Sequence, residues 1–313
     1  MSCYVKTCIF VLLTLVLIGS LNCGPSPTAE TRLPIEVLDQ LGRTVKMDKI
    51  PQRIISLAPS NTEVLFALGL ADKVVAVTDY DNYPPEAQEK PSIGGFTSPN
   101  MEKIIALSPD LVLATSIHEK TAVPYLEARG ITVFALAPKT IDDILQSISL
   151  VGKITGNDDE ASRLVSSMGQ RISAITEKTR NLSEGQLPAV LYIVWHDPIT
   201  TAGAGTVLDE LIQKAGGKNI AHELTGYPKI SLETVVQKNP GVIIAGVGHG
   251  SGSDGPLLFA RDDPRLRDTT ARLQGRIYYA DADLANRAGP RIVDALEEFA
   301  RNIHPEIFGQ STK

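Results

Sequence analysis

The chain contains no cysteine beyond residue 23. Its three cysteines, Cys3, Cys8 and Cys23, all lie at the amino terminus, and the remaining 290 residues have none. This absence excludes a disulfide framework, a cysteine-based zinc site, an iron–sulfur cluster and a catalytic thiol from the folded body.

The chain also lacks an excess of basic residues. Its 30 lysines and arginines are outnumbered by 36 acidic residues, which gives a formal charge of −6. Nucleic-acid-binding proteins normally present a basic face, so this balance argues against such a partner. With 43% apolar residues the chain is expected to fold rather than remain disordered, and its 313 residues are enough for about two domains.

Enzyme motifs are absent too. The histidines lack metal-ligand spacing, and no Gly-x-Ser-x-Gly elbow occurs. The run Gly250–Gly255 fits a Gly-x-Gly-x-x-Gly template, but Pro256 comes directly after it and no ribose-binding acid is suitably placed, so we interpret it as a flexible loop. We therefore predict no catalytic residue, resident metal or cofactor. His118, His196 and His249 are only minor candidates to approach a metal within a bound ligand; surface or internally satisfied histidines are the default.

The amino terminus has the features of an export signal. Lys6 precedes an apolar run, Ile9 to Ile18, which is too short to cross a bilayer, for which about 20 residues are needed. Cys23 and the Pro-, Ser- and Thr-rich segment after it resemble a bacterial lipoprotein signal, although Ser20 and Asn22 depart from the usual residues before the cysteine. We predict a signal peptide over 1–22 and a lipidated tether over 23–34. A simple secretory signal with an incidental cysteine is the alternative.

The rest of the chain alternates short apolar runs with helical patterns. A hairpin is expected over 35–38 and 44–47, and a helix capped by Ser60 and Asn61 is expected to come after a buried strand over 53–57. Such alternation predicts parallel sheets with crossover helices. Further expected strands are 74–77, 111–113, 131–134, 190–194, 242–245 and 277–279, and further helices 101–107, 118–129, 206–215 and 290–302.

The two halves repeat one unit. Residues 101–114 align without gaps on residues 232–245, at an offset of 131; each segment consists of a short helix, a Pro stop and a buried strand. Between the halves, residues 157–183 contain no Pro and carry an apolar stripe at helical spacing. We predict an α/β fold of two Rossmann-like lobes, over 35–155 and 185–313, joined by a single long rigid helix over 156–184, with a ligand cleft between the lobes.

Several motifs in order resemble a known family. They are Arg53–Glu63, Asp81–Ala87, Met101–Ala114, Thr201–Gly203, Gly216–Ile220 and Arg287–Ile292. Together they are similar to the substrate-binding proteins of vitamin B12, haem and siderophore ABC importers, most of all to the vitamin B12 branch. The resemblance runs from about Ile35 to the carboxyl terminus. It implies two α/β lobes, one connecting helix and little movement on ligand binding.

The resemblance also suggests functional residues. Glu102 and Glu233, at equivalent places in the repeated unit, match glutamates that meet arginines on the two permease subunits; taken alone, each is an ordinary acid in a first helical turn. The predicted ligand-binding residues are Tyr83, Phe96, Trp195, Tyr227, Asp283 and Arg287, with Arg291 expected to brace the following helix. The loop around Phe96 differs from that of the vitamin B12-binding proteins. For every one of these residues, packing or solvation is the alternative.

We therefore expect an exported, lipid-anchored binding protein on a bacterial membrane, periplasmic or at the cell surface. It would capture a corrinoid and deliver it to the permease dimer of an ABC importer with its ATPase. Its membrane contact would be through the lipid alone. The first alternative keeps this role with haem or a ferric siderophore as ligand. A metal-cofactor enzyme or chelatase on the same two-lobed fold, and a surface adhesin or sensor, are the alternatives of another class.

Overall fold

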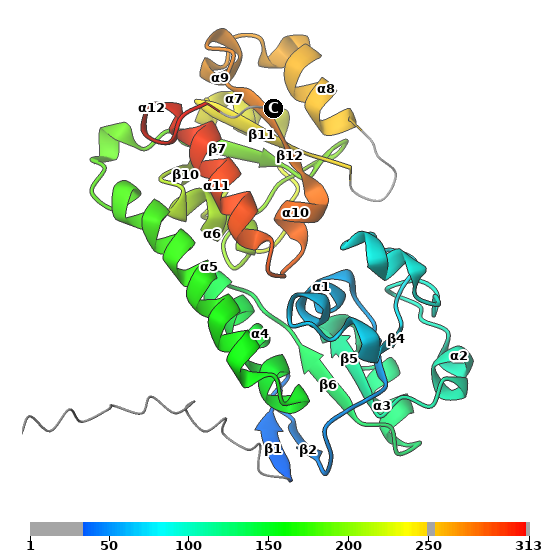
Figure 1. Ribbon diagram of the computed structural model, residues 1–313. Helices are drawn as coiled ribbons and strands as arrows, with labels where there is room; N and C mark the ends of the chain where they lie inside the picture. The colour runs from blue at the N-terminus through cyan, green and yellow to red at the C-terminus, as the bar shows by residue number, and fades with distance from the viewer. Residues whose placement is uncertain (1–33, 249–253, 311–313) are drawn as a thin grey trace, which may run out of the picture. The chain divides into compact units, whose positions relative to one another are not determined.

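A computed structural model describes residues 34–248 and 254–310. The predicted signal peptide, Cys23, His249 and most of the Gly250–Gly255 run lie outside these residues. The described residues belong to one compact unit. Among them, two four-stranded parallel sheets form the centres of two lobes (Figure 1).

The amino-terminal lobe contains the sheet β4-β3-β5-β6. Its strands are β3 (Ile54–Ser56), β4 (Val74–Ala76), β5 (Leu111–Thr115) and β6 (Val133–Leu136). A separate antiparallel hairpin, β1 (Ile35–Leu38) and β2 (Thr44–Met47), precedes the sheet, as the sequence predicts. The helices of this lobe are α1 (Pro59–Ala67), α2 (Met101–Ala106), α3 (Ala122–Glu127) and α4 (Ile141–Thr155).

The carboxyl-terminal lobe contains the sheet β10-β7-β11-β12. Its strands are β7 (Ala189–Ile193), β10 (Lys218–Asn219), β11 (Val242–Val247) and β12 (Ile277–Asp281), with a small antiparallel hairpin of β8 (Trp195–His196) and β9 (Ile199–Thr200). Its helices are α6 (Val207–Lys214), α7 (Leu232–Lys238), α8 (Gly255–Asp262), α9 (Thr270–Leu273), α10 (Ala282–Asn286), α11 (Ile292–Ile303) and α12 (Pro305–Phe308).

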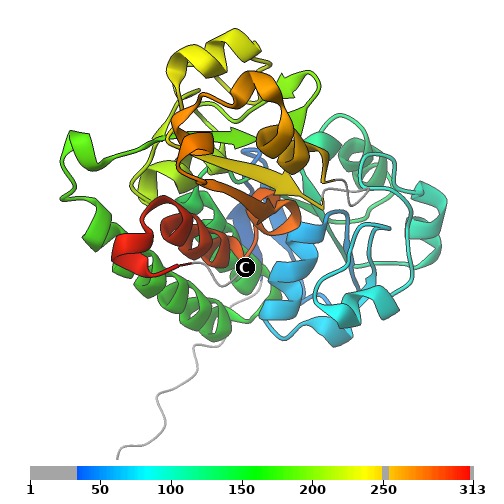
Figure 2. The ribbon, with the colours of Figure 1, turned by 90° about the horizontal axis from the view of Figure 1, so that it is seen from above.

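The connecting helix is α5 (Asp158–Thr179), 22 residues or roughly 33 Å long. Gly156 ends α4 in the left-handed conformation, so α5 starts as a separate helix rather than a continuation. On α5, Arg171 binds Glu297 of α11 at 2.8 Å and also pairs with Asp294. Figure 2 shows α11 (red) beside α5 (green), so the connecting helix is fixed along one side of the carboxyl-terminal lobe.

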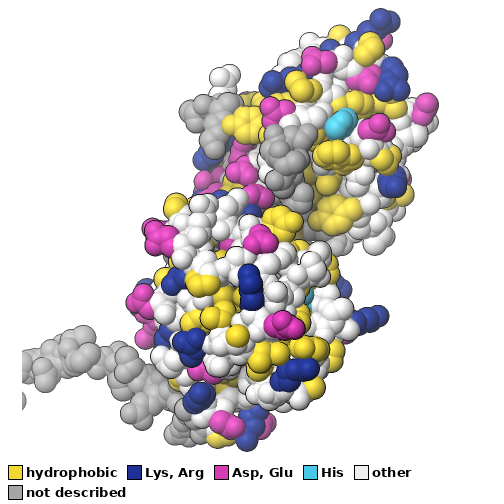
Figure 3. Space-filling model, turned by 90° about the vertical axis from the view of Figure 1, so that its right-hand side faces the viewer, with side chains coloured by type: hydrophobic (Ala, Val, Ile, Leu, Met, Phe, Trp, Pro, Cys, Tyr) yellow, Lys and Arg dark blue, Asp and Glu magenta, His cyan; other side chains and the backbone are white. Residues whose placement is uncertain are grey.

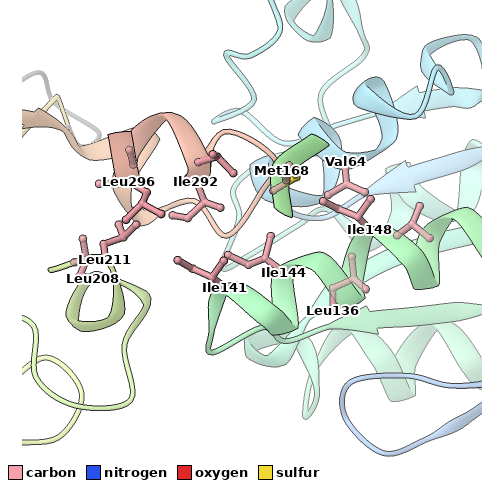
Figure 4. Packing of buried hydrophobic residues seen from close by; sticks show 14 of the residues in the cluster. Val64, Leu136, Ile141, Ile144, Ile148, Met168, Leu208, Leu211, Ile292 and Leu296 are labelled. Carbon is pink, nitrogen blue, oxygen red and sulfur yellow. The ribbon is translucent and has the colours of Figure 1, made fainter. Parts of the chain in front are cut away.

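One hydrophobic cluster crosses from lobe to lobe (Figure 4). Val64 of the amino-terminal lobe, Ile144 of α4, Met168 of α5, and Leu211 and Ile292 of the other lobe all belong to it and are buried. Each such side chain stabilises the fold by about 1.5–3 kcal/mol on burial. Because the two lobes and the connecting helix share this core, their spacing is held by side-chain packing and not by the chain connection alone.

Two local predictions are wrong in detail, and one helix lies where the sequence analysis predicts no element. Helix α1 begins at Pro59, which is favoured in a first helical turn, and Asn61 does not cap it: the buried amide donates to the Ala114 carbonyl at 3.0 Å. The helix predicted over 118–129 is shorter, because a 3₁₀ turn over Ser116–His118 precedes α3. Helix α4 lies in a segment for which no element was predicted, although Thr140 and Asp143 form a capping box at its start.

Candidate functional site between the lobes

Segments that follow strands of the two sheets meet between the lobes. The segments after β3 and β4 carry Glu63 and Asn82, and the segment after β12 carries Asp283, Arg287 and Arg291. Hydrogen bonds and ion pairs join these segments across the lobes. Ligands of parallel α/β proteins bind outside the carboxyl ends of the strands, so this arrangement places the expected binding region between the lobes.

Glu63 is the centre of the inter-lobe contacts. Its side chain is 2% exposed. It accepts hydrogen bonds from Nε of Arg291 at 2.9 Å and from Nη2 at 2.6 Å, and Nη1 of Arg287 approaches it at 3.3 Å. A buried carboxylate is tolerated when it is paired and hydrogen-bonded, and a bidentate guanidinium supplies both conditions. The motif Arg53–Glu63 contains this residue, but sequence reasoning assigned it no role.

Arg287 makes further contacts across the lobes. It donates to Oδ1 of Asn82 at 2.6 Å and to the carbonyl of Tyr80 at 3.2 Å, and it pairs with Asp283 at 2.9 Å. The Asn82 amide donates to the same Asp283 carboxylate at 2.9 Å. We call Glu63, Asn82, Asp283, Arg287 and Arg291 the inter-lobe bracket. Asp283 and Arg287 are predicted to contact ligand. In the structure they pair with each other and form hydrogen bonds to Asn82 of the opposite lobe.

The outcome for Arg291 differs from the prediction that it braces the following helix. Its guanidinium reaches Glu63 of the other lobe, and its flat face lies over the ring of Tyr83, 3.8 Å from the centroid. The desolvation of Arg291 is outweighed by its bonds to Glu63, so its pKa is raised above the usual value. The cation–π contact holds Tyr83 in place while 42% of that residue stays exposed.

The carboxyl-terminal lobe contributes two further exposed aromatics. Trp195, 43% exposed, donates from Nε1 to the Asp197 carbonyl at 2.9 Å, and its ring packs against His196 at 5.0 Å. Tyr227, 55% exposed, lies in a loop that is held to the segment after β9 by backbone hydrogen bonds. These rings come from the segments around β8 and β9, next to the carboxyl end of β7.

Phe96 is placed differently from the other predicted aromatics. It is only partly exposed, and its ring meets that of buried His118 edge to face at 5.5 Å. The Nδ1 atom of His118 accepts from the backbone N–H of Thr115, so Nε2 carries the proton and donates to the Phe96 carbonyl at 2.7 Å. Burial lowers the pKa of His118. His118 is therefore a neutral, fully bonded histidine that fixes the Phe96 loop.

Glu102 and Glu233 occupy equivalent exposed positions. Each is the second residue of its helix, α2 or α7, and each helix is capped by a side chain that accepts a hydrogen bond from the backbone three residues later: Asn100 in one lobe and Ser231 in the other. Helices α2 and α7 each lead into the start of the next strand, β5 or β11. Their amino ends therefore lie near the edge of the sheet at which the parallel strands end. Hydrogen bonds from its own backbone and from Ser231 lower the pKa of Glu233. Neither glutamate forms an ion pair within the described part of the chain.

The described residues hold neither a metal cluster nor a membrane span. No group of three or more His, Cys, Asp or Glu side chains among residues 34–248 and 254–310 is arranged to hold a metal ion. No helix in the same residues has both the length and the apolar character needed to cross a membrane. The face shown in Figure 3 mixes acidic and basic side chains without a dominant sign.

Two α/β lobes with parallel sheets and a shared core form the two-lobed architecture of periplasmic solute-binding proteins. The comparison with protein families agrees: residues 54–284 match the model of the periplasmic binding proteins, and the chain belongs to this family. It is a substrate-binding protein of the ABC-transporter type rather than an enzyme, and it acts on the outer side of the cytoplasmic membrane. Proteins of this family carry transported ligands, not catalytic cofactors.

Individual relatives cover most of the chain. The uncharacterized ABC transporter substrate-binding lipoprotein YvrC of Bacillus subtilis is 35% identical over 88% of this chain and 87% of its own length. The crystal structure of the periplasmic vitamin B12-binding protein of Vibrio cholerae is 30% identical, with a TM-score of 0.70 over 84% of this chain and 99% of that one. A periplasmic haem-binding protein of Roseiflexus is 29% identical, with a TM-score of 0.71 over 81% and 98%.

Proposed function

We propose that this protein captures a corrinoid between its lobes and delivers it to the permease and ATPase of an ABC importer. The observation that carries the proposal is the set of exposed rings from both lobes, Tyr83, Trp195 and Tyr227, with 42%, 43% and 55% of each residue exposed. Flat conjugated ligands bury large areas against aromatic faces. The vitamin B12-binding relative from Vibrio cholerae supports the same ligand class.

The charge of the site favours a ligand without strong negative charge. Arg287 and Arg291, the cations that contact the segment around Tyr83, are bound to Glu63 and Asp283. An anionic siderophore would need free cations, and this pairing occupies both of these arginines, whereas a corrinoid presents amides around a flat ring. Haem is the second candidate, because the exposed phenols of Tyr83 and Tyr227 belong to a residue type that ligates haem iron, and a haem-binding protein is among the structural relatives.

The ligand is identified by titrating residues 24–313 with cyanocobalamin, haemin and a ferric hydroxamate siderophore. Trp195 is the only tryptophan, so quenching of its emission reports on one defined position of the site. Equilibrium dialysis measures the same affinities without an optical signal. We expect cyanocobalamin to bind most tightly. Binding of haemin alone would overturn the corrinoid assignment in favour of haem.

Delivery is proposed to use Glu102 and Glu233 as docking points for permease arginines. Exposed charge pairs set orientation and association rate more than affinity. We expect the double variant Glu102→Lys/Glu233→Lys to bind ligand normally and to lose stimulation of the importer's ATPase in proteoliposomes. Asp158→Lys/Asp159→Lys reverses two exposed acids in the first turn of α5 and is the control with the same change of charge. Normal stimulation by the double variant would refute the docking role.

Anchoring is proposed to occur through a lipid on Cys23. The lipoprotein relative from Bacillus subtilis supports this assignment. In cells, the wild-type protein should partition into detergent with the membrane fraction, and Cys23→Ser should not. If the Cys23→Ser protein still partitions with the membranes, the lipid anchor at this residue is wrong. Release of both proteins would favour the simple secretory signal.

A further inference from the structure

Glu63 lies where two arginines of the other lobe converge. Arg291 binds it with two nitrogens, and Arg287 adds a third contact. The side chains of Arg287 and Arg291 are 12% and 19% exposed, so both guanidinium groups lie mostly inside the protein. Together with Asp283, Glu63 balances the two positive charges with two negative ones.

The same arginines lie beside the exposed ring of Tyr83. Arg291 covers one side of Tyr83, and Arg287 binds the backbone carbonyl of Tyr80 and the side chain of Asn82, two neighbours of that ring. A group that neutralises or reorients these guanidinium groups therefore changes the charge and shape of the protein surface beside Tyr83. Asp81 near Arg287 and Asp281 near Arg291 are further acidic groups in the same region, and neither contacts both arginines as Glu63 does.

We propose that Glu63 is a specificity-determining positioning residue: it holds Arg287 and Arg291 away from the ligand and, together with Asp283, balances their charge, so that the site favours a neutral ligand over an anionic ligand of the same shape. This inference rests on the proposed function as a ligand-binding protein, but not on the identity of the ligand. Within the described residues, Glu63 is the acid that contacts both arginines. Its removal leaves one uncompensated positive charge beside the aromatic surface.

A purely structural role for Glu63 makes a different prediction. If the bracket only holds the lobes together, its loss changes the affinity for every ligand by the same factor. If Glu63 sets the charge of the site, its loss improves the binding of an anionic ligand relative to a neutral ligand of the same shape. The decisive quantity is therefore the ratio of two affinities and not either affinity alone.

Two matched ligand pairs give this ratio. One is cyanocobalamin with its monocarboxylic acid, in which a side-chain amide is replaced by a carboxylate. The other is haemin with its dimethyl ester, in which both carboxylates are masked. For Glu63→Gln we expect the ratio of anionic to neutral affinity to rise about tenfold in whichever pair binds, as one uncompensated charge at short range in a partly solvated site would produce. The rise should shrink at high salt.

Two further variants control the test. Glu63→Gln/Arg291→Gln removes one charge of each sign and should return the ratio to the wild-type value. Asp39→Asn changes another buried acid of the same lobe, which is paired with Arg43 in the first hairpin, and should leave the ratio unchanged. An equal change of both affinities in Glu63→Gln, in a variant shown to be folded by circular dichroism, would overturn the proposal. Failure of cyanocobalamin to bind wild type would instead overturn the corrinoid assignment, and the haemin pair would still test Glu63. Binding of neither pair by the wild-type protein would overturn the charge-selection role together with the proposed function.

Discussion

The two lobes share a framework and differ at the ends of their strands. In each sheet the repeated strand, β5 or β11, lies in the middle, and Leu113 and Ile244 occupy the same buried position on it. The turn before each of these strands has a non-glycine residue in the left-handed conformation, Ser108 at φ 46° and Asn239 at φ 44°. The repeat in the sequence is therefore a repeat in backbone geometry.

The difference lies in the segment that comes after the neighbouring strand. After β3 the chain enters α1 directly and buries Glu63, whereas after β7 it forms the β8–β9 hairpin and exposes Trp195. The amino-terminal lobe thus supplies Glu63 to the inter-lobe bracket. The carboxyl-terminal lobe supplies Asp283, the two arginines and two exposed rings. The repeated interior therefore maintains the fold, while the segments that break the repeat form the candidate ligand site.

The largest expected effects come from the shared framework. Leu113→Ala and Ile244→Ala each remove a side chain that is 0% exposed, and each should lower the free energy of unfolding by about 2–5 kcal/mol. Urea denaturation measures both. Leu273→Ala, at a residue that is 73% exposed, should change it by less than about 0.5 kcal/mol. A large loss in one lobe only would show that the two interiors are not equivalent.

The next effect is a loss of ligand affinity, expected for an aromatic residue at the carboxyl ends of the strands and not for one elsewhere on the surface. Tyr83→Ala should weaken ligand binding about tenfold, or ~1.4 kcal/mol, because it removes an aromatic wall of the site. Tyr125→Ala is a closely matched control: that ring is 38% exposed and lies under Arg129 at 3.6 Å, but α3 places it near the start of β6, at the opposite edge of the sheet. Equal losses of affinity in calorimetric titrations would remove Tyr83 from the site.

A smaller effect concerns pH and the loop that carries Phe96. Burial lowers the pKa of His118 below its ordinary value of 6.5, so the unfolded chain takes up a proton that the folded chain resists. The stabilising contribution is present above about pH 6.5 and is lost as the pH falls below it. Wild type should therefore lose more stability than His118→Gln between about pH 7.5 and 5. Parallel stability curves in chemical denaturation would contradict this role of His118.

The smallest effect tests the paired turns. A serine in the left-handed region is strained, whereas asparagine tolerates it better. Ser108→Gly should raise the free energy of unfolding by about 0.5 kcal/mol, and Asn239→Gly should raise it by less. Ser149→Gly, on the exposed side of α4, should lower it by about 0.5 kcal/mol because glycine weakens a helix interior. Thermal denaturation of the three variants ranks their changes in the free energy of unfolding. A lower free energy of unfolding in Ser108→Gly would contradict backbone strain at this serine.

Much of the framework could be predicted from local patterns. Parallel strands of buried residues stand out as apolar runs, and the repeat at an offset of 131 marks the paired helices and strands. The stripe on the connecting helix is also confirmed: Met168 and Ile175 are buried, and Leu164 and Ile172 pack against the shared core. These features depend on periodicity, which a sequence displays directly.

The inter-lobe bracket could not be predicted in this way. Glu63 and Arg291 are 228 residues apart, and nothing in their immediate neighbours signals that they meet. A single acid within the apolar run of α1 was the available sign, since a buried charge requires a partner. The contact of Tyr83, Trp195 and Tyr227 with ligand stays a prediction, because burial and exposure alone do not show which exposed rings face a ligand.

The most direct test of capture between the lobes is amide hydrogen exchange with and without cyanocobalamin. We expect slower exchange in both lobes on binding: around Tyr80–Tyr83 in one lobe, and around Trp195–Thr200 and Ala282–Arg287 in the other. Exchange in α3 and α9, far from the facing strand ends, should not change. Protection confined to one lobe, or bound ligand with no protection at either set of strand ends, would contradict capture between the lobes.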